Sequence, residues 1–103
     1  MYNYIIYKAV NKHNGKAYIG STTRSIEERR RDHLAKANTG VGAAYFQEAI
    51  ATYSPDAFDW EQLDTASSVD ELAAKEILYI EKYNTLKDGY NSDKGGGFKK
   101  TIY

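Results

Sequence analysis

Two short runs near the start of the chain have the residue pattern of β-strands. Residues 4–10 read Tyr-Ile-Ile-Tyr-Lys-Ala-Val, and residues 16–21 read Lys-Ala-Tyr-Ile-Gly-Ser. Isoleucine and tyrosine, which are common in strands, are prominent in both runs. Residues 11–15 between them, Asn-Lys-His-Asn-Gly, have the composition of a turn. We therefore predict a β-hairpin in this part of the chain.

The register of this hairpin decides whether Tyr7 and Tyr18 lie together. A two-residue turn at Asn14 and Gly15 separates the two tyrosines. A loop that pairs Val10 with Gly15 places Tyr7 opposite Tyr18, and directly opposed residues have Cβ atoms about 5 Å apart. Only this second register brings the two hydroxyls to one place, and the sequence leaves both registers open.

Three later segments carry the signals of helices. The first begins at a capping box formed by Ser25 and Glu28 and is expected to reach about residue 36 or 37. The last begins at a second capping box, formed by Ser68 and Glu71, and is expected to reach about residue 83. Between them, residues 43–53 repeat apolar side chains on one helical face and stop before a Ser-Pro pair.

The order of the predicted elements indicates the fold class. Residues 58–63 read as a third strand, so the order is two strands, two helices, a strand, a helix and a tail. This order predicts an α+β fold, in which a small three-stranded antiparallel sheet, made of the hairpin and one later strand, is flanked by about three helices. Residues 1–92 form the expected domain, and the Gly- and Lys-rich residues 93–103 are expected to form a tail or a linker.

The composition excludes several kinds of chemistry. The chain has 103 residues, no Cys and two His, so disulfides, thiolate catalysis and a histidine-rich metal site are excluded or disfavoured. Ten Tyr against three Phe indicate a core with several hydroxyls at its margins. No apolar run approaches the roughly 18 residues of a membrane span. We expect a soluble, intracellular (cytoplasmic) protein that does not contact a membrane.

The net charge of zero hides a segregation of charges along the chain. Residues 1–36 carry eight basic and three acidic side chains, a net charge of +5; residues 37–81 carry one and nine, a net −8; residues 82–103 carry five and two, a net +3. Basic ends around an acidic middle suit a module with one face for a polyanion, or they are solvated surface. A neutral domain by itself grips nucleic acid weakly, because affinity scales with the number of phosphates neutralised.

One carboxylate in the last predicted helix is placed unusually. Glu76 falls in the centre of an apolar stripe whose other members are Val69, Leu72, Ala73, Ile80 and Tyr83. A carboxylate in such a stripe is costly to bury unless it is paired or holds a metal. It either forms a salt bridge, with Arg29 as the candidate, or binds a hard cation such as Mg²⁺ or Mn²⁺. We see no second carboxylate partner in the sequence, so we expect one metal ion rather than two.

The first predicted helix places Arg29 and His33 on one face, because they are four residues apart. His33 either relays a proton or is a hydrogen-bonded structural residue. His13, in the turn of the hairpin, is expected to be a surface residue.

Together these features resemble the GIY-YIG nuclease superfamily, and most of all the catalytic domains of phage and intron homing endonucleases. The resemblance rests on five separated elements between residues 4 and 97. They are Ile5-Ile6-Tyr7, then Tyr18-Ile19-Gly20 after ten residues, the helix with Arg29 and His33, the helical Glu76, and Gly89-Tyr90-Asn91. The chain departs from the family in its first triplet, where Ile5 stands in place of the glycine.

The resemblance implies a metal-dependent DNA endonuclease that hydrolyses phosphodiester bonds. Tyr7 and Tyr18 would flank the attacking water, with Tyr7 as the general base, and Arg29 would stabilise the transition state. Glu76 would anchor a single Mg²⁺ or Mn²⁺ ion, and Asn91 would position the phosphate or brace the site. A tyrosine with a pKa near 10 is a poor base unless positive charge lowers that pKa.

Three further residues are expected near the substrate. Lys16 lies two residues before Tyr18 and would add positive charge on the same face of the strand. Gly20 would let the backbone approach closely where a side chain would clash. Ser21 would make a minor contact.

The expected partner is DNA, and the resemblance also implies a separate DNA-binding domain or subunit, because homing enzymes of this family usually have one. A homodimer is a further arrangement that the sequence leaves open. Two other interpretations remain: a catalytically inactive nucleic-acid-binding module with the same fold, and an unrelated α+β interaction domain whose tyrosines only pack.

Overall fold

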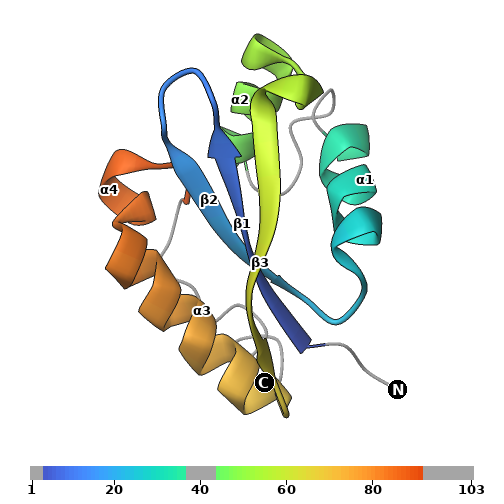
Figure 1. Cartoon of the computed structure of the whole chain (residues 1–103), viewed down its shortest axis with the longest axis vertical. Helices are drawn as coiled ribbons and strands as arrows, with labels where there is room; N and C mark the ends of the chain where they lie inside the picture. Colours follow the sequence, from blue (N-terminus) through green and yellow to red (C-terminus); the bar gives the residue numbers. More distant parts are fainter. Residues whose placement is uncertain (1–3, 37–43, 92–103) are drawn as a thin grey trace.

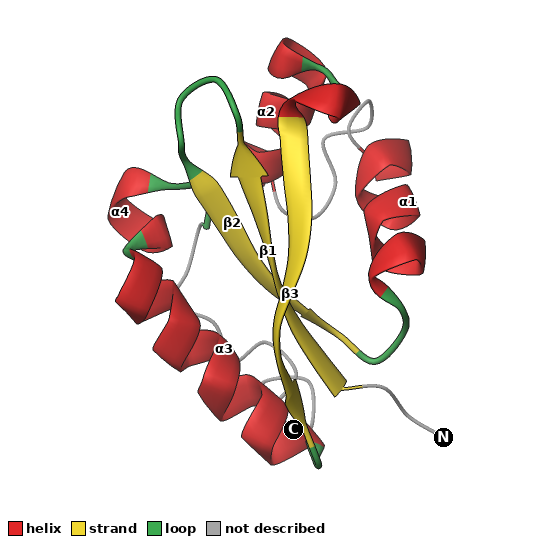
Figure 2. Cartoon of the chain, in the orientation of Figure 1, coloured by secondary structure: helices red, strands yellow, loops and turns green. Residues whose placement is uncertain are grey.

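A three-stranded antiparallel sheet forms the centre of the protein, with helices packed on both of its faces (Figures 1 and 2). The computed structural model describes residues 4–36 and 44–91. The elements are β1 (Tyr4–Asn11), β2 (Ala17–Thr22), α1 (Ile26–Lys36), α2 (Ala44–Tyr53), a 3-10 turn η1 (Pro55–Ala57), β3 (Phe58–Ala66), α3 (Val69–Tyr83) and α4 (Thr85–Asp88). The α+β fold class and the three-stranded antiparallel sheet that the sequence predicts are confirmed.

The first strand of the chain is the central strand of the sheet, because the strand order is β2-β1-β3. Both neighbours of β1 are antiparallel to it. Both edges of the strand are therefore paired. The two cores cover its faces, and Ile6, Tyr7 and Ala9 have no exposed surface. A tyrosine with no exposure on a central strand is held on every side by protein.

The hairpin adopts neither of the two registers considered from the sequence. Tyr7 lies opposite Gly20, and Tyr18 lies opposite Ala9, so the two tyrosines are diagonal neighbours and not an opposed pair. The reason is the length of the turn: the backbone N–H of Asn11 donates to the carbonyl of Lys16, which leaves four residues between them. The pairing differs by two positions from each expected register.

Two asparagines fix this turn. The side-chain oxygen of Asn11 accepts from the N–H of His13 at 2.8 Å, and that of Asn14 accepts from the N–H of Lys16 at 2.9 Å. Such bonds to the backbone two residues further on stabilise tight turns locally. The sequence signal for a turn was correct, but its length depends on these side-chain bonds.

The sheet separates two apolar cores. On one face, Ala9 packs with residues of α2, η1 and β3, including Phe46, Ile50 and Phe58. On the other face, Ile6 and Ile19 pack against Leu72 and Ile80 of α3. Successive residues of a strand point to opposite faces, so Tyr7 and its diagonal neighbour Tyr18 belong to the face covered by α2.

The capping boxes begin their helices as predicted. The N–H of Glu28 donates to the Ser25 hydroxyl at 3.2 Å, and the N–H of Glu71 donates to the Ser68 hydroxyl at 3.1 Å. Helix α1 ends at Lys36 and α3 at Tyr83, as expected. Helix α2 is described from residue 44, and the expected residue 43 lies outside the described residues.

Three parts of the fold differ from the predicted elements. Strand β3 continues to Ala66, three residues beyond the predicted end. Two short elements, η1 and α4, were not predicted. Helix α4 follows directly on α3 because Asn84 adopts a left-handed conformation, with φ 56°, that ends α3 and redirects the chain.

Within the described parts of the chain, no helix is long and apolar enough to cross a membrane. The predicted tail at residues 93–103 lies outside the described residues.

Candidate active site

The buried hydroxyl of Tyr7 is hydrogen-bonded to the imidazole of His33. The Tyr7 oxygen lies 2.9 Å from Nε2 of His33. Tyr7 comes from β1 and His33 from α1, which packs beside the sheet (Figure 1). The two side chains are 0% and 1% exposed. The sequence left the role of His33 open, and the structure brings its ring to the predicted catalytic tyrosine.

Aromatic rings surround this hydrogen bond. The ring of Tyr18 lies 6.2 Å from that of Tyr7 and 5.4 Å from that of His33, and it stacks on Phe46 at 4.5 Å. Trp60 of β3 stacks on Tyr7 at 5.7 Å and lies 6.0 Å from His33. Packing of this kind restricts the rotation of Tyr7 and His33.

Trp60 and Phe46 were not predicted as site residues. Phe46 was assigned only to the apolar face of a helix, and Trp60 lies in a segment predicted only as a strand. The signal in the sequence was that Trp60 is the single tryptophan of the chain. Its indole N–H is buried, and no hydrogen-bond partner is found for it among the described residues.

Gly20 is the residue that makes room for Tyr7. A Cβ atom on Gly20 would lie 2.3 Å from Cζ and from the hydroxyl oxygen of Tyr7, and 2.8 Å from Cε2 of Tyr18. Separations under 3.0 Å are not tolerated without movement of one group. We predicted a glycine that permits a close approach, and the group that approaches it is the Tyr7 side chain.

Burial raises the pKa of Tyr7 well above its usual value of 10.0. The neighbouring Tyr18 raises that pKa further, whereas the charge and the hydrogen bond of Arg29 lower it. Lys16, Arg29 and a metal ion are the sources of positive charge that the family resemblance predicts would lower this pKa. With the side chains alone, burial outweighs Arg29, and Tyr7 carries its proton at neutral pH.

Arg29 connects the site to the charges of α1. Its Nη1 lies 3.6 Å from Oδ2 of Asp32, and the same carboxylate forms an ion pair with Arg24. Tyr7, Tyr18 and Asp32 raise the pKa of Arg29 against the effect of its burial. Arg29 therefore stays charged beside the Tyr7 hydroxyl. Asp32, which holds the guanidinium, was not predicted from the sequence.

Glu76 lies half-buried in α3, and its negative charge raises the pKa of Tyr7 slightly. In residues 4–36 and 44–91, no three His, Asp or Glu side chains gather into a ready-made metal site. A divalent cation at Glu76 would take its other oxygen ligands from water and from a phosphate group. Mg²⁺ commonly binds in this way, so the residues present fit a hard cation with a single protein anchor.

Asn91 braces strand β2. Its side-chain oxygen accepts from the N–H of Ile19 at 2.9 Å, and its side-chain nitrogen donates to the carbonyl of Ile19 at 2.8 Å. Asn91 is 6% exposed, so this amide pairs with the edge strand in the way that another strand would. Of the two roles suggested by the resemblance, the geometry fits bracing.

Tyr90, the residue before Asn91, extends these contacts to the hairpin turn, and the two residues together form a clamp on β2. The N–H of Tyr90 donates to the carbonyl of Ala17 at 2.9 Å. The Tyr90 hydroxyl accepts from the side-chain amides of Asn11 and Asn14, each at 3.1 Å. Tyr90 therefore holds the start of β2 and the turn together, and with them the register that places Gly20 opposite Tyr7.

Two predicted substrate contacts do not join the group around Tyr7. Ser21 lies opposite Ile6 in the sheet and is buried, so it is on the face covered by α3. Lys16 precedes β2 at the hairpin end, and its side chain is exposed. It lies four residues from Gly20, which is about 13 Å along an extended strand.

The fold and the site define an α+β domain with a tyrosine–histidine pair beside an arginine, and with a glutamate on α3 whose charge acts on the tyrosine. Residues 2–91 match the family model of the GIY-YIG catalytic domain, and the chain therefore belongs to the GIY-YIG nuclease family. This confirms the resemblance inferred from the sequence motifs.

Two solved structures share the fold. A mutant form of the catalytic domain of the intron endonuclease I-TevI has a TM-score of 0.80 and 22% identity, covering 90% of this chain and 96% of that one. A second structure, of the catalytic domain of the homing endonuclease I-TevI, has a TM-score of 0.76 and 23% identity, covering 87% and 98%. None of the curated proteins compared with the chain matches it.

Proposed function

We propose that this domain is a metal-dependent endonuclease that hydrolyses phosphodiester bonds in DNA with water as the nucleophile. Membership in the GIY-YIG nuclease family supports the reaction class. The observation that carries the proposal is the buried hydrogen bond between the Tyr7 hydroxyl and Nε2 of His33, 2.9 Å long.

This hydrogen bond offers a path for the proton of the attacking water. Because the pKa of Tyr7 is raised, the phenol is protonated and cannot simply take up a proton. Because Tyr7 has no exposed surface in this structure, substrate binding must open the site enough for a water to reach the phenol. The Tyr7 oxygen then accepts the water proton while the phenolic proton moves to Nε2 of His33. The water oxygen then bonds to phosphorus, the bond from phosphorus to the leaving oxygen breaks, and solvent protonates the leaving oxygen.

Arg29 stabilises the charge that develops on the phosphate. Its guanidinium stays positive, and its hydrogen bond and charge act on Tyr7, where the water would be activated. A fixed positive charge in a partly buried site is more effective than one in water. Asp32 keeps the guanidinium oriented through the contact of 3.6 Å.

Glu76 would hold the divalent cation, Mg²⁺ or Mn²⁺. When bound, the cation supplies Lewis-acid stabilisation of the phosphate and of the leaving oxygen. The carboxylate of Glu76 acts electrostatically on Tyr7, which is consistent with both groups serving the same phosphate. Its position between the buried Ala73 and Ile80 on the apolar face of α3 also agrees with a role that packing alone does not require.

The alternative function is a nucleic-acid-binding module that keeps the fold without catalysis. The hydrogen bond between Tyr7 and His33 disfavours it, because a module that only binds has no need to bury two polar side chains in this way. The solved I-TevI structures are described as catalytic domains. We infer that a separate DNA-binding domain or subunit would direct this domain to its site on DNA. Dimerisation is the other arrangement that would extend the contact with DNA.

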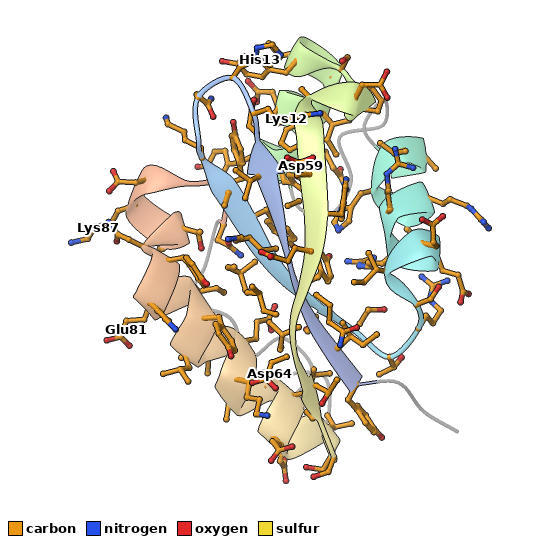
Figure 3. The ribbon with its side chains drawn as sticks, in the orientation of Figure 1. Lys12, His13, Asp59, Asp64, Glu81 and Lys87 are labelled. Carbon is orange, nitrogen blue, oxygen red and sulfur yellow. The ribbon has the colours of Figure 1, made fainter. Side chains whose placement is uncertain are left out.

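The test is cleavage of supercoiled plasmid by the purified chain in Mg²⁺ or in Mn²⁺. We expect nicked or linear DNA that disappears with EDTA and in the Glu76→Gln variant, which keeps the size of the side chain and removes its charge. Exposed Glu81 lies on the same helix (Figure 3), and Glu81→Gln is the matched control that should retain activity.

The outcomes separate the two functions. Metal-dependent cleavage that Glu76→Gln abolishes and Glu81→Gln retains supports the enzyme. Binding of DNA with no cleavage in either metal supports the inactive module. Cleavage that is equally strong in EDTA would contradict the metal-dependent reaction.

A further inference from the structure

A pocket of about 430 Å³ opens at the hairpin end of the molecule, apart from the Tyr7 hydroxyl. Its wall is formed by the turn of the hairpin, by one side of α2 and by the segment that follows α4. The residues that matter for its chemistry are Asn14, Lys16, Tyr45, Glu48, Tyr53 and Tyr90. The pocket contains no residue of the tyrosine–histidine pair.

Helix α2 contributes an aromatic strip to this pocket. Tyr45 and Tyr53, with Ala49 between them at a spacing of four residues, follow one side of the helix. Tyr45 is 60% exposed and Tyr53 is 39% exposed. The ring of Tyr53 stacks on that of His13, which the hairpin turn carries toward α2 (Figure 3). The pocket thus offers a tyrosine face that the core does not cover.

Polar groups of both signs lie around this strip. Lys16 contributes an ammonium group that can contact a phosphate, and Glu48 contributes a carboxylate that can accept from an exocyclic amino group. Asn14 is held in place because its amide donates to the Tyr90 hydroxyl, which lies on the same wall. An aromatic platform with a cation, an acceptor and an amide matches the groups of a nucleotide.

We propose that this pocket binds one unstacked nucleotide of the DNA, a few nucleotides away from the bond that is cut. The base stacks on Tyr45, and its phosphate contacts Lys16. The pocket volume lies within the range of small-molecule sites, roughly 300–1,000 Å³. Tyr18 and Gly20 follow Lys16 along strand β2, so a DNA strand that lies along β2 would reach both the pocket and the site around Tyr7. The inference rests on the proposed function for its substrate class.

Binding to a single-stranded DNA oligonucleotide at low salt tests this pocket. The oligonucleotide carries a fluorescent 2-aminopurine base at successive positions, and EDTA prevents cleavage. We expect quenching at one position, because stacking on an aromatic ring quenches this base. Tyr45→Ala should remove the quenching and weaken affinity about tenfold, in the range of a lost base–aromatic stack. Tyr45→Phe should preserve both.

The matched control is Tyr83→Ala. Tyr83 is 39% exposed but lies at the end of α3, outside the pocket. We expect this variant to bind like the unchanged protein. Equal affinity and equal quenching in Tyr45→Ala and Tyr83→Ala would overturn the proposal.

The same experiment separates this inference from the proposed enzymatic function. If Tyr45→Ala leaves binding and quenching unchanged while plasmid is still cleaved, the pocket is rejected and the endonuclease proposal stands. Quenching that depends on Tyr45 in a chain that never cleaves supports the pocket and rejects the endonuclease. A free deoxynucleoside monophosphate should compete only weakly, because it lacks the neighbouring phosphates; competition at micromolar concentration would instead identify a site for free nucleotides.

Discussion

Tyr7 and Gly20 face each other across strands β1 and β2, and the ring of Tyr7 occupies the space where a side chain on Gly20 would lie. A Cβ atom there would be 2.3 Å from the Tyr7 hydroxyl oxygen. This glycine therefore belongs to the site through the tyrosine it accommodates. The hydroxyl reaches His33 only because the ring can lie flat over the strand at this position.

Gly20→Ala should slow cleavage by more than its loss of folding stability explains. The methyl group must displace the ring of Tyr7, that of Tyr18, or the strand itself. Overpacking of this kind costs about 1–3 kcal/mol, and a displacement of about 1 Å in a reacting group can cost about a hundredfold in rate. Plasmid nicking rates and urea denaturation of the same preparation measure the two effects.

Gly15→Ala is the control for that variant. Gly15 lies in the hairpin turn with φ 75°, and a Cβ atom there meets nothing within 4 Å. The strained backbone should cost about 1 kcal/mol of stability without moving Tyr7. If Gly15→Ala lost as much activity as Gly20→Ala, the loss would reflect stability alone.

Tyr7→Phe should abolish most cleavage and preserve the fold. The substitution removes the hydroxyl that lies 2.9 Å from His33 and keeps the ring that stacks on Trp60. Loss of a positioned acid–base group lowers rates by about 10² to 10⁴. Single-turnover cleavage and circular dichroism check the two expectations. Tyr83→Phe removes a phenol from the opposite side of the sheet and should cleave normally; full activity in Tyr7→Phe would refute the proton path.

Stability should fall at alkaline pH in a way that depends on Tyr7. Burial raises the pKa of this phenol above its usual value of 10.0 in the folded state. Its contribution is therefore fully present below pH 10.0 and is lost as the pH rises from there toward the higher folded pKa, because the unfolded chain releases the proton first. Urea midpoints measured from about pH 8 to 11 should fall more steeply in the unchanged protein than in Tyr7→Phe. Parallel curves for the two proteins would show that Tyr7 is not buried in its neutral form.

Asn91→Leu should destabilise the domain strongly. The substitution removes both bonds to the backbone of Ile19 and leaves a buried N–H and a carbonyl of the edge strand without these partners. Two lost bonds of this type cost about 2–4 kcal/mol. Thermal unfolding measures the change. Gln62→Leu, in β3, makes a similar amide-to-leucine change at an exposed position, and a loss equal to that of Asn91→Leu would argue against the clamp.

Local signals predicted most of the fold. The two capping boxes, the apolar faces of two helices and the turn-rich residues 11–15 identified the main helices and the hairpin. Each of these signals is a property of neighbours in the sequence, because a cap, a helical face or a turn is completed within a few residues. The short helix α4 was missed since its four residues carry no apolar period, and its position depends on the left-handed Asn84.

The sequence indicated several residues of the candidate site, but not their arrangement or their partners. Tyr7, Arg29, His33 and Glu76 were identified from motif and spacing, but Trp60 and Asp32 were not, because nothing local distinguishes a tryptophan in a strand or an aspartate on a charged helix. Ser21 lies on the face covered by α3, and Lys16 lies at the hairpin end. The hairpin register, which the sequence left open, differs by two positions from both of the registers considered and makes Tyr7 and Tyr18 diagonal neighbours.

The family, the α+β class and the residues able to carry the chemistry can be read from the sequence, because they follow from short patterns of side chains. How those residues meet depends on long-range contacts in the folded chain. The Tyr90 and Asn91 clamp helps to hold the hairpin register, the register sets Tyr7 over Gly20, and α1 then brings His33 within 2.9 Å of the phenol. The direction of the pKa shift of Tyr7 also depends on the folded structure, since burial of the phenol outweighs the effect of the nearby arginine.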